Sequence, residues 1–294
     1  MSLTAEPDDI VRRFLFEELD VRGALVRLTG VWRKMCEGRD YPDAVRRLLG
    51  ELTAVAVLVG CNLKQPGRLT LQVQGQGPVR LLVIDCTAAL GIRGMAMFSP
   101  QVHDVPVPAL LGDGRLFLTL QSEIAAQPYQ SIVPLRGETI GTIFEHYLEQ
   151  SEQQPARLFL HAAGEYAVGL FLQKLPGADA RDADGWKRVE SQAATVSAVE
   201  LAALPSEVLL THLFPEELLR VFRVRPVTYD CPEDWAKVRN MLRSLGRAEV
   251  ENVLREQGEV VVHDDICNRD YRLGPEDVAA LFADSTPAGS STIH

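Results

Sequence analysis

A carboxylate and a cysteine lie three residues apart near the C-terminus, in the stretch HDDICNRDY that runs from His263 to Tyr271. Asp264 and Cys267 have the spacing of one half of a zinc knuckle, although structural zinc sites usually place two cysteines at this spacing. The stretch lies between two apolar runs and contains turn-forming residues, which is typical of a hairpin. It is therefore either a polar hairpin with an ordinary cysteine or a metal site with an altered ligand set.

The composition excludes several classes of protein. The chain has 294 residues, 46% of them hydrophobic, which is enough for one large domain or two to three small ones. Its formal net charge is −10, and Lys and Arg are interleaved with Asp and Glu, which argues against a nucleic-acid surface. The acidic N-terminus does not resemble a signal peptide, and the apolar run at 52–61 is too short to span a membrane. We therefore expect a cytoplasmic protein with no nucleic-acid or membrane partner.

The five cysteines do not form a disulfide framework, because a chain of this length with an odd number of them fits a reducing compartment. Cys36, Cys61 and Cys86 lie in or beside apolar helix and strand patterns, where a free cysteine is most often a small core residue. Any disulfide would be transient or regulatory.

The first part of the chain predicts an α+β domain covering residues 1–176. Residues 9–19 have apolar positions at helical spacing, and Asp40-Tyr-Pro-Asp is typical of the start of a helix that runs to about Cys61. Alternating segments separated by turn residues predict strands of a meandering, antiparallel sheet at 68–74, 79–85, 93–98, 115–121 and 130–135. A helix at about 138–150 and strands at 156–162 and 167–175 complete the domain.

The rest of the chain predicts two further parts. The polar stretch 176–185 is the best candidate boundary. Short helical patterns at 186–204, 206–213 and 215–222 follow, so residues 177–226 form a helical linker of modest stability. Residues 227–294 predict a small domain with two helices, a hairpin and a last helix. A domain of this size often needs a metal or a disulfide to stabilise it.

Several stretches, in this order, resemble the heat-shock protein 33 family of redox-regulated chaperones: RRFLFEELDVRGALVRL, the DYP helix start, the QGQGP turn, GIRGMAMF, SEQQPARLF and GLFLQKLP. The resemblance covers nearly the whole chain. It implies an α/β N-terminal domain, a helical linker and a small C-terminal zinc domain with a Cys-x-Cys pair and a Cys-x-x-Cys pair. This division matches the boundaries taken from composition and periodicity.

The family's cysteine positions carry over with two departures. Cys231 matches the first cysteine of the first pair, and Glu233 replaces the second; Asp264 replaces the first cysteine of the second pair, and Cys267 matches its second. Zinc accepts both thiolate and carboxylate, so a site made of Cys231, Glu233, Asp264 and Cys267 is chemically allowed, but losing two thiolates lowers its affinity. The alternatives are a metal-free hairpin with two ordinary cysteines and a lasting Cys231–Cys267 disulfide. Such a disulfide would stabilise the folded domain, the opposite of what the family's usual switch needs.

The resemblance implies a holdase that binds unfolding proteins without nucleotide, is activated by stress and oligomerises on activation. The alternative is a constitutive or partner-binding family member that has lost zinc and redox control. We expect no enzyme activity, because the chain shows neither histidines at metal-ligand spacing nor a nucleophile elbow. Gly75-x-Gly77 lies between two predicted strands and lacks a P-loop lysine, so it predicts a turn and no nucleotide site.

Overall fold

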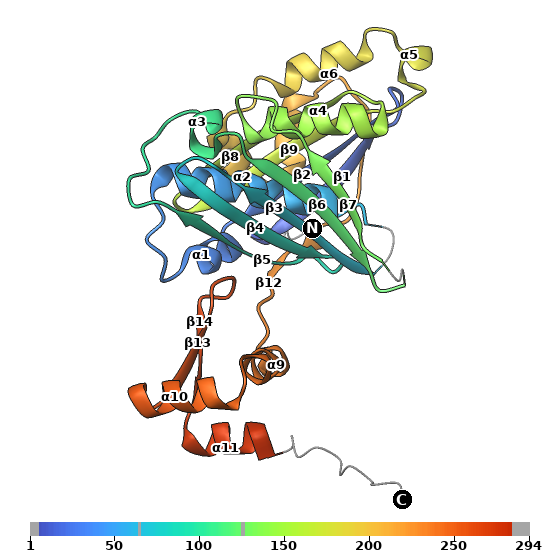
Figure 1. The fold of residues 1–294 in the computed structure, drawn as a ribbon. Coiled ribbons are helices and arrows are strands. Elements are labelled where there is room, and N and C mark those ends of the chain that lie inside the picture. Colours follow the sequence, from blue (N-terminus) through green and yellow to red (C-terminus); the bar gives the residue numbers. More distant parts are fainter. Residues whose placement is uncertain (1–5, 64–65, 125–126, 284–294) are drawn as a thin grey trace, which may run out of the picture. The chain divides into compact units, whose positions relative to one another are not determined.

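The computed structural model describes residues 6–63, 66–124 and 127–283. These residues form two compact units, the first ending at Asp230 and the second beginning at Cys231 (Figure 1). Two six-stranded sheets build the first unit, and a two-stranded hairpin belongs to the second. The α+β fold class predicted from the sequence is confirmed.

The first sheet is antiparallel and has the strand order β10-β1-β2-β9-β8, with β11 paired to β1. Its strands are β1 (Ile10–Phe16), β2 (Val21–Leu28), β8 (Ala156–Ala163), β9 (Tyr166–Lys174), β10 (Leu219–Val221) and β11 (Arg225–Pro226). The helix predicted at 9–19 is wrong, because this segment forms β1 and the turn after it. The sheet is covered on both faces, so its strands bury apolar residues on both sides and lose the alternation that identifies a half-exposed strand.

The second sheet has the order β12-β5-β4-β3-β6-β7 and is antiparallel except for β12, which runs parallel to β5. The strands are β3 (Gly67–Gln74), β4 (Val79–Thr87), β5 (Gly91–Phe98), β6 (Arg115–Ser122), β7 (Tyr129–Val133) and β12 (Thr228–Tyr229), with the short helix α3 (Val107–Leu111) between β5 and β6. The five strands predicted from alternation are confirmed. They alternate because only one face of this sheet covers the core.

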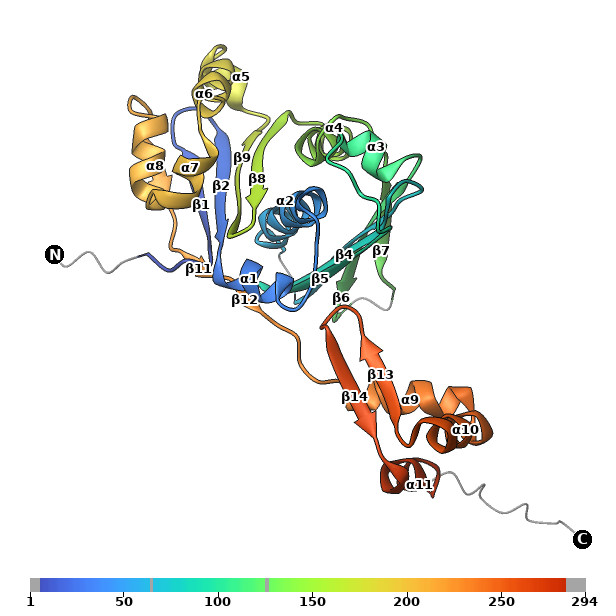
Figure 2. The same cartoon turned by 90° about the vertical axis from the view of Figure 1, so that its left-hand side faces the viewer.

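Helix α2 (Asp43–Gly60) lies between the two sheets (Figure 2). Thirteen of its eighteen residues are buried, as expected for a helix that packs on all sides. The helix predicted from the Asp40-Tyr-Pro-Asp start is thereby confirmed. Helix α1 (Gly30–Cys36) precedes it, and α4 (Ile140–Glu152) begins at a capping box between Thr139 and Thr142.

Four short helices follow β9: α5 (Ala178–Arg181), α6 (Gly185–Ala193), α7 (Ala198–Ala203) and α8 (Ser206–Leu213). We call residues 178–213 the helical segment. The helix predicted at 215–222 is wrong, because residues 219–221 form β10. The sequence predicted boundaries after residues 176 and 226, whereas the described residues divide between 230 and 231, so the helical segment belongs to the first unit. That it acts as a separate linker stays a prediction.

The second unit consists of α9 (Trp235–Leu245), α10 (Arg247–Gln257), the hairpin of β13 (Val260–Asp264) and β14 (Arg269–Leu273), and α11 (Pro275–Ala283). All these elements were predicted. Their small core contains Val238, Leu242, Val250, Tyr271 and Leu281, among others. In the described part of the chain, no helix is both long and apolar enough to cross a membrane.

Candidate functional site

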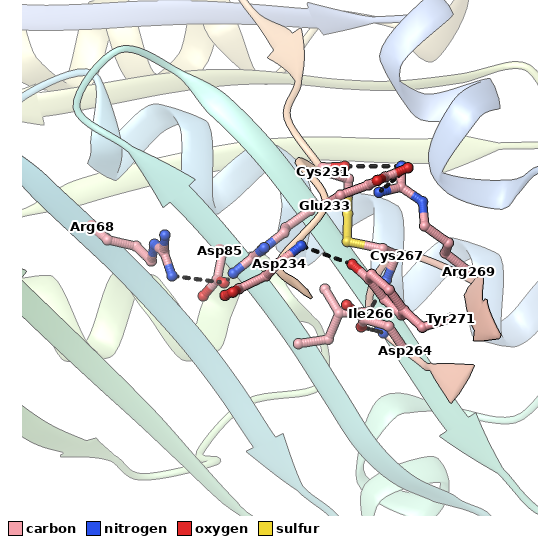
Figure 3. Close-up of a disulfide and its surroundings, with 11 residues drawn as sticks. Arg68, Asp85, Cys231, Glu233, Asp234, Asp264, Ile266, Cys267, Arg269 and Tyr271 are labelled. Atoms are coloured by element: carbon pink, nitrogen blue, oxygen red, sulfur yellow. Dashed lines mark hydrogen bonds and ion pairs between the residues drawn. A yellow bond between two sulfur atoms is a disulfide. The ribbon is translucent and has the colours of Figure 1, made fainter. Parts of the chain in front are cut away.

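Cys231 and Cys267 are joined by a disulfide in the second unit (Figure 3). Their Cα atoms lie 5.7 Å apart, within the usual range for a disulfide, and 36 positions separate them in the sequence. Cys231 is the first residue of the unit, and Cys267 lies in the turn of the hairpin and is only 9% exposed. The structure thus brings together the two cysteines that the sequence selects, and their bond ties the start of the unit to its hairpin.

Asp264 shapes the turn that presents Cys267. Its Oδ1 accepts hydrogen bonds from the backbone N–H groups of Ile266 at 3.0 Å and Cys267 at 3.2 Å, so its side chain closes the turn on itself. Asn268 completes the turn with a φ of 50°, a conformation that asparagine tolerates better than most residues. The carboxylate predicted as a metal ligand therefore has a local structural role here.

Glu233 contacts Trp235 and Arg269. One of its oxygens accepts a hydrogen bond from the indole Nε1 of Trp235 at 3.0 Å, and the other lies 3.9 Å from Nη1 of Arg269. Arg269 also donates from Nη2 to the carbonyl oxygen of Cys231 at 3.1 Å. The arginine on β14 thus supports the segment that carries the first cysteine.

Tyr271 holds the same segment from the core of the unit. Its hydroxyl accepts a hydrogen bond from the backbone N–H of Asp234 at 2.9 Å, and its ring meets that of Trp235 edge to face with centroids 4.8 Å apart. The sequence interpretation did not select Arg269, Tyr271 or Trp235. The alternation in 269–273 could have identified Tyr271, because it predicts that this side chain points into the core.

These residues do not fit a zinc ion as they are arranged. Both sulfur atoms are used in the disulfide, one oxygen of Asp264 closes the turn, and Glu233 binds Trp235. Zinc needs deprotonated thiols and about four converging ligands. Within the described ranges, no group of three or more His, Cys, Asp or Glu side chains is placed to hold a metal ion.

The other three cysteines are free and lie in the first unit. Burial raises the pKa of the Cys36 and Cys61 thiols to about 11 and that of Cys86 to about 12. Because the thiolate is the reactive form, these cysteines are poor candidates for redox chemistry at neutral pH. Their prediction as core residues is confirmed for Cys61 and Cys86, which are fully buried, and Cys36 is half-buried.

The helical segment is fixed to the first sheet by an apolar cluster. Phe14 and Phe16 of β1 pack against Phe214, which follows α8. The rings of Phe16 and Phe214 meet edge to face, with their centroids 4.9 Å apart. Leu209 and Leu210 of α8 are buried in the same cluster. Detaching the segment would therefore expose a large apolar face of the sheet to water.

A buried ion pair adds to this attachment. Arg27 of β2, which is 6% exposed, donates from Nη2 to Glu6 at 2.9 Å and from Nη1 to the carbonyl oxygen of Leu204 at 2.8 Å. Glu6 also accepts from the backbone N–H of Ser206 at 2.8 Å and from the Ser206 hydroxyl. Although burial raises the pKa of Glu6, the hydrogen bonds from Ser206 and the charges of Arg27 and Arg12 outweigh it and lower the pKa. We call Glu6, Arg27 and Ser206 the clasp.

A cavity of about 360 Å³ lies beside the helical segment, and Glu51 of α2 lines it together with His161 of β8 and Val196, Ala198 and Leu201 of the segment. Burial raises the pKa of Glu51 to about 7, despite the opposing charge of Arg47. The ionised carboxylate is thus poorly accommodated in the folded protein.

Stability is expected to depend on the protonation of Glu51. Between pH 4.5 and 7 the folded state binds a proton that the unfolded state does not, so the free energy of unfolding should fall as pH rises through this window. Glu51→Gln should remove this dependence and stabilise the protein by about 1–3 kcal/mol at pH 8. Urea unfolding at pH 5, 6, 7 and 8 measures it, with Glu149→Gln on exposed helix surface as the control. An unchanged pH dependence in Glu51→Gln would contradict the assignment.

The chain is similar to known proteins over nearly its whole length. A family model described as Hsp33 protein matches residues 9–274. A protein named 33 kDa chaperonin from Chromobacterium violaceum is 41% identical over 276 residues, covering 93% of this chain and 94% of the relative. Another of the same name from Methylobacillus flagellatus is 39% identical, with the same coverage.

The fold has a counterpart among solved structures. The crystal structure of a 33 kDa chaperonin, a heat shock protein 33 homolog from Thermotoga maritima, matches with a TM-score of 0.82 at 21% identity, covering 95% of this chain and 99% of that one. From the two-sheet fold, the family model and the relatives at about 40% identity, we conclude that the chain belongs to the Hsp33 family.

Proposed function

We propose that this protein is a holdase chaperone that binds unfolding proteins without nucleotide. The observation that carries the proposal is an apolar patch on the outer face of the second sheet, opposite to the face that packs on α2. It consists of Leu81, Val83, Met97, Phe117 and Ile132, and we call it the sheet patch. Met97 is 48% and Ile132 55% exposed. Exposed apolar surface of this kind marks an interaction site.

Strand register places these side chains on one face of the sheet in two groups, separated by Gln72 of β3, which is opposite both Val83 and Phe117. Ile132 of β7 is opposite Phe117 of β6, and Leu81 of β4 is opposite Met97 of β5, while Val83 follows Leu81 on the same face. None of the five belongs to the hydrophobic clusters formed by the described residues. The sheet patch is thus apolar surface that the fold of the described residues does not use, and it can contact apolar segments of many sequences.

The turn at Gly75–Gly77 is not arranged as a phosphate-binding loop. The backbone N–H groups of Gln76 and Gly77 donate to the carbonyl oxygen of Leu111, and that of Gly75 donates to Arg80. A phosphate-binding loop needs free N–H groups that point at the ligand. These three are already bound to backbone oxygens.

We further propose that the redox response differs from that of a four-cysteine zinc domain. Neither neighbouring pair can form a disulfide, because Glu233 and Asp264 replace one cysteine of each. The Cys231–Cys267 bond instead joins the two arms of the second unit. Oxidation should then stabilise this unit, whereas reduction combined with mild warming should loosen it. Self-association on activation, which the family resemblance implies, stays a prediction.

The replacement of two cysteines by Glu233 and Asp264 favours one alternative function, a constitutive or partner-binding family member that has lost zinc and redox control. In that case neither oxidant nor reductant would change helicity or client binding. A client-binding assay performed once with oxidant and once with reductant distinguishes the two functions.

Light scattering of a thermally unfolding client, with no nucleotide present, tests the holdase proposal. The unmodified protein should suppress aggregation at near-stoichiometric amounts, and M97S/I132S should lose most of this effect because it removes the two most exposed side chains of the sheet patch. The matched control is M241S/L245S on α9, where the side chains are 42% and 58% exposed. Equal suppression by both double variants, or suppression that requires ATP, would contradict the proposal; circular dichroism verifies that each variant is folded.

A further inference from the structure

A pocket of about 350 Å³ in the second unit combines positive charge with an apolar lining. Three arginines line it: Arg239 and Arg243 from α9 and Arg272 from β14. The two on α9 are four residues apart and therefore lie on the same face of the helix. Pockets of this size bind small molecules.

Two of these guanidinium groups have no acidic ion-pair partner among the residues that the structure describes. In the part of the chain that the structure describes, no carboxylate forms an ion pair with Arg239 or Arg243; Arg239 lies 5.9 Å from the Trp235 ring, and Arg243 donates to the carbonyl oxygen of Leu281. Like charges at this spacing repel each other, so the arrangement is unfavourable without an anion. Arg272, in contrast, pairs with Glu259 and Asp270.

The remaining lining restricts the ligand. Trp235 and Ala280 supply apolar surface, and Leu273 and Leu281, which also line the pocket, are only 2% and 4% exposed. Among the described residues of the lining, Asp277 is the one that is acidic, and its Oδ2 accepts a hydrogen bond from the backbone N–H of Gly274 at the start of α11. A ligand with only charge would leave the apolar surface uncovered, and an apolar ligand would leave the two arginines without an anion.

We propose that this pocket binds a small carboxylate with an apolar or aromatic body. The carboxylate would accept hydrogen bonds from Arg239 and Arg243, whose planar guanidinium groups match its two oxygens. The body would lie against Trp235 and Ala280. Because the lining comes from α9, β14 and α11, the ligand bridges three elements of the second unit and stabilises it by mass action. This inference is independent of the proposed chaperone function.

The test uses the full chain labelled with ¹⁵N and three probes. 3-Phenylpropionate carries both the charge and the body, 3-phenylpropanol carries the body alone, and inorganic phosphate carries charge alone. The chain has three tryptophans, so its spectrum contains three indole N–H signals. We expect 3-phenylpropionate to shift the Trp235 signal in a saturable manner and the other two probes to shift it far less at matched ionic strength.

Three variants decide whether the pocket is responsible. Arg239→Gln should weaken binding of 3-phenylpropionate by about tenfold, since it removes a charge-assisted hydrogen bond donor. Arg255→Gln on α10 lies outside the lining and should bind as the unmodified protein does. The proposal is overturned if 3-phenylpropanol shifts the signal equally, if Arg239→Gln binds unchanged, or if the Trp32 or Trp186 signal moves instead. Arg239→Lys, which keeps the charge, guards against a folding defect and should bind with intermediate affinity.

Discussion

Replacing Arg27 with methionine is expected to lower the free energy of unfolding of the first unit by about 1.5–3 kcal/mol. The substitution removes one partner of the clasp and leaves the carboxylate of Glu6, with 11% of its side chain exposed, with Arg12 at 3.5 Å as its remaining counter-charge. It also removes the donor to the carbonyl oxygen of Leu204. Urea unfolding followed by tryptophan fluorescence measures the loss, and hydrogen exchange should show it first in α7 and α8.

The control is Arg220→Met on β10. Arg220 pairs with Glu17, but 61% of its side chain is exposed, so this pair should contribute no more than about 1 kcal/mol. The double variant E6L/R27M should recover part of the stability because it removes both buried charges together. If Arg27→Met and Arg220→Met have equal effects, the clasp does not hold the helical segment.

Breaking the Cys231–Cys267 disulfide is expected to destabilise the second unit by about 2–4 kcal/mol. The physical reason is the greater conformational freedom of the unfolded chain once the 36-position separation is no longer closed. A small unit with a thin core has little stability in reserve, so the reduced form should unfold at moderate temperature. Hydrogen exchange of β13 and β14, with and without dithiothreitol, measures the change.

The double variant C231S/C267S separates this effect from other actions of the reductant. It should be as unstable as the reduced protein and should no longer respond to dithiothreitol. The zinc-to-protein ratio of the reduced protein, measured in parallel, tests the competing ligand set of Cys231, Glu233, Asp264 and Cys267. A ratio near one that is lost in Cys231→Ser, with no loss of stability on reduction, would replace the disulfide by a metal site as the element that stabilises the unit.

Much of the fold could be predicted because an element that is buried on one face carries a regular pattern of apolar and polar residues in the sequence. The strands of the second sheet alternate, since only one of its faces covers the core, and α2 has a clear start. Strand β1 was missed because its apolar residues at 10, 11, 14 and 15 also fit a helical spacing, and burial on both faces of the first sheet leaves no clear alternation to exclude it. The strand β10 was missed because its three residues are too short to show a period.

The candidate site was partly predictable for a similar reason. The family resemblance selects Cys231 and Cys267, but it leaves metal, disulfide and free thiols as alternatives, because only geometry decides which atoms meet. The clasp could not be predicted, since Glu6 and Ser206 are 200 positions apart and neither has a local signature. Asp264 was selected as a ligand, whereas its neighbours in sequence already satisfy one of its oxygens.

Both ends of the helical segment lead into the same sheet, β9 before it and β10 after it. A segment detached from the sheet would thus remain a closed loop anchored at two points. Because both ends stay anchored, the helical segment gains less conformational entropy on detaching than a free chain would. Its reattachment to the sheet is a first-order process whose rate does not depend on protein concentration.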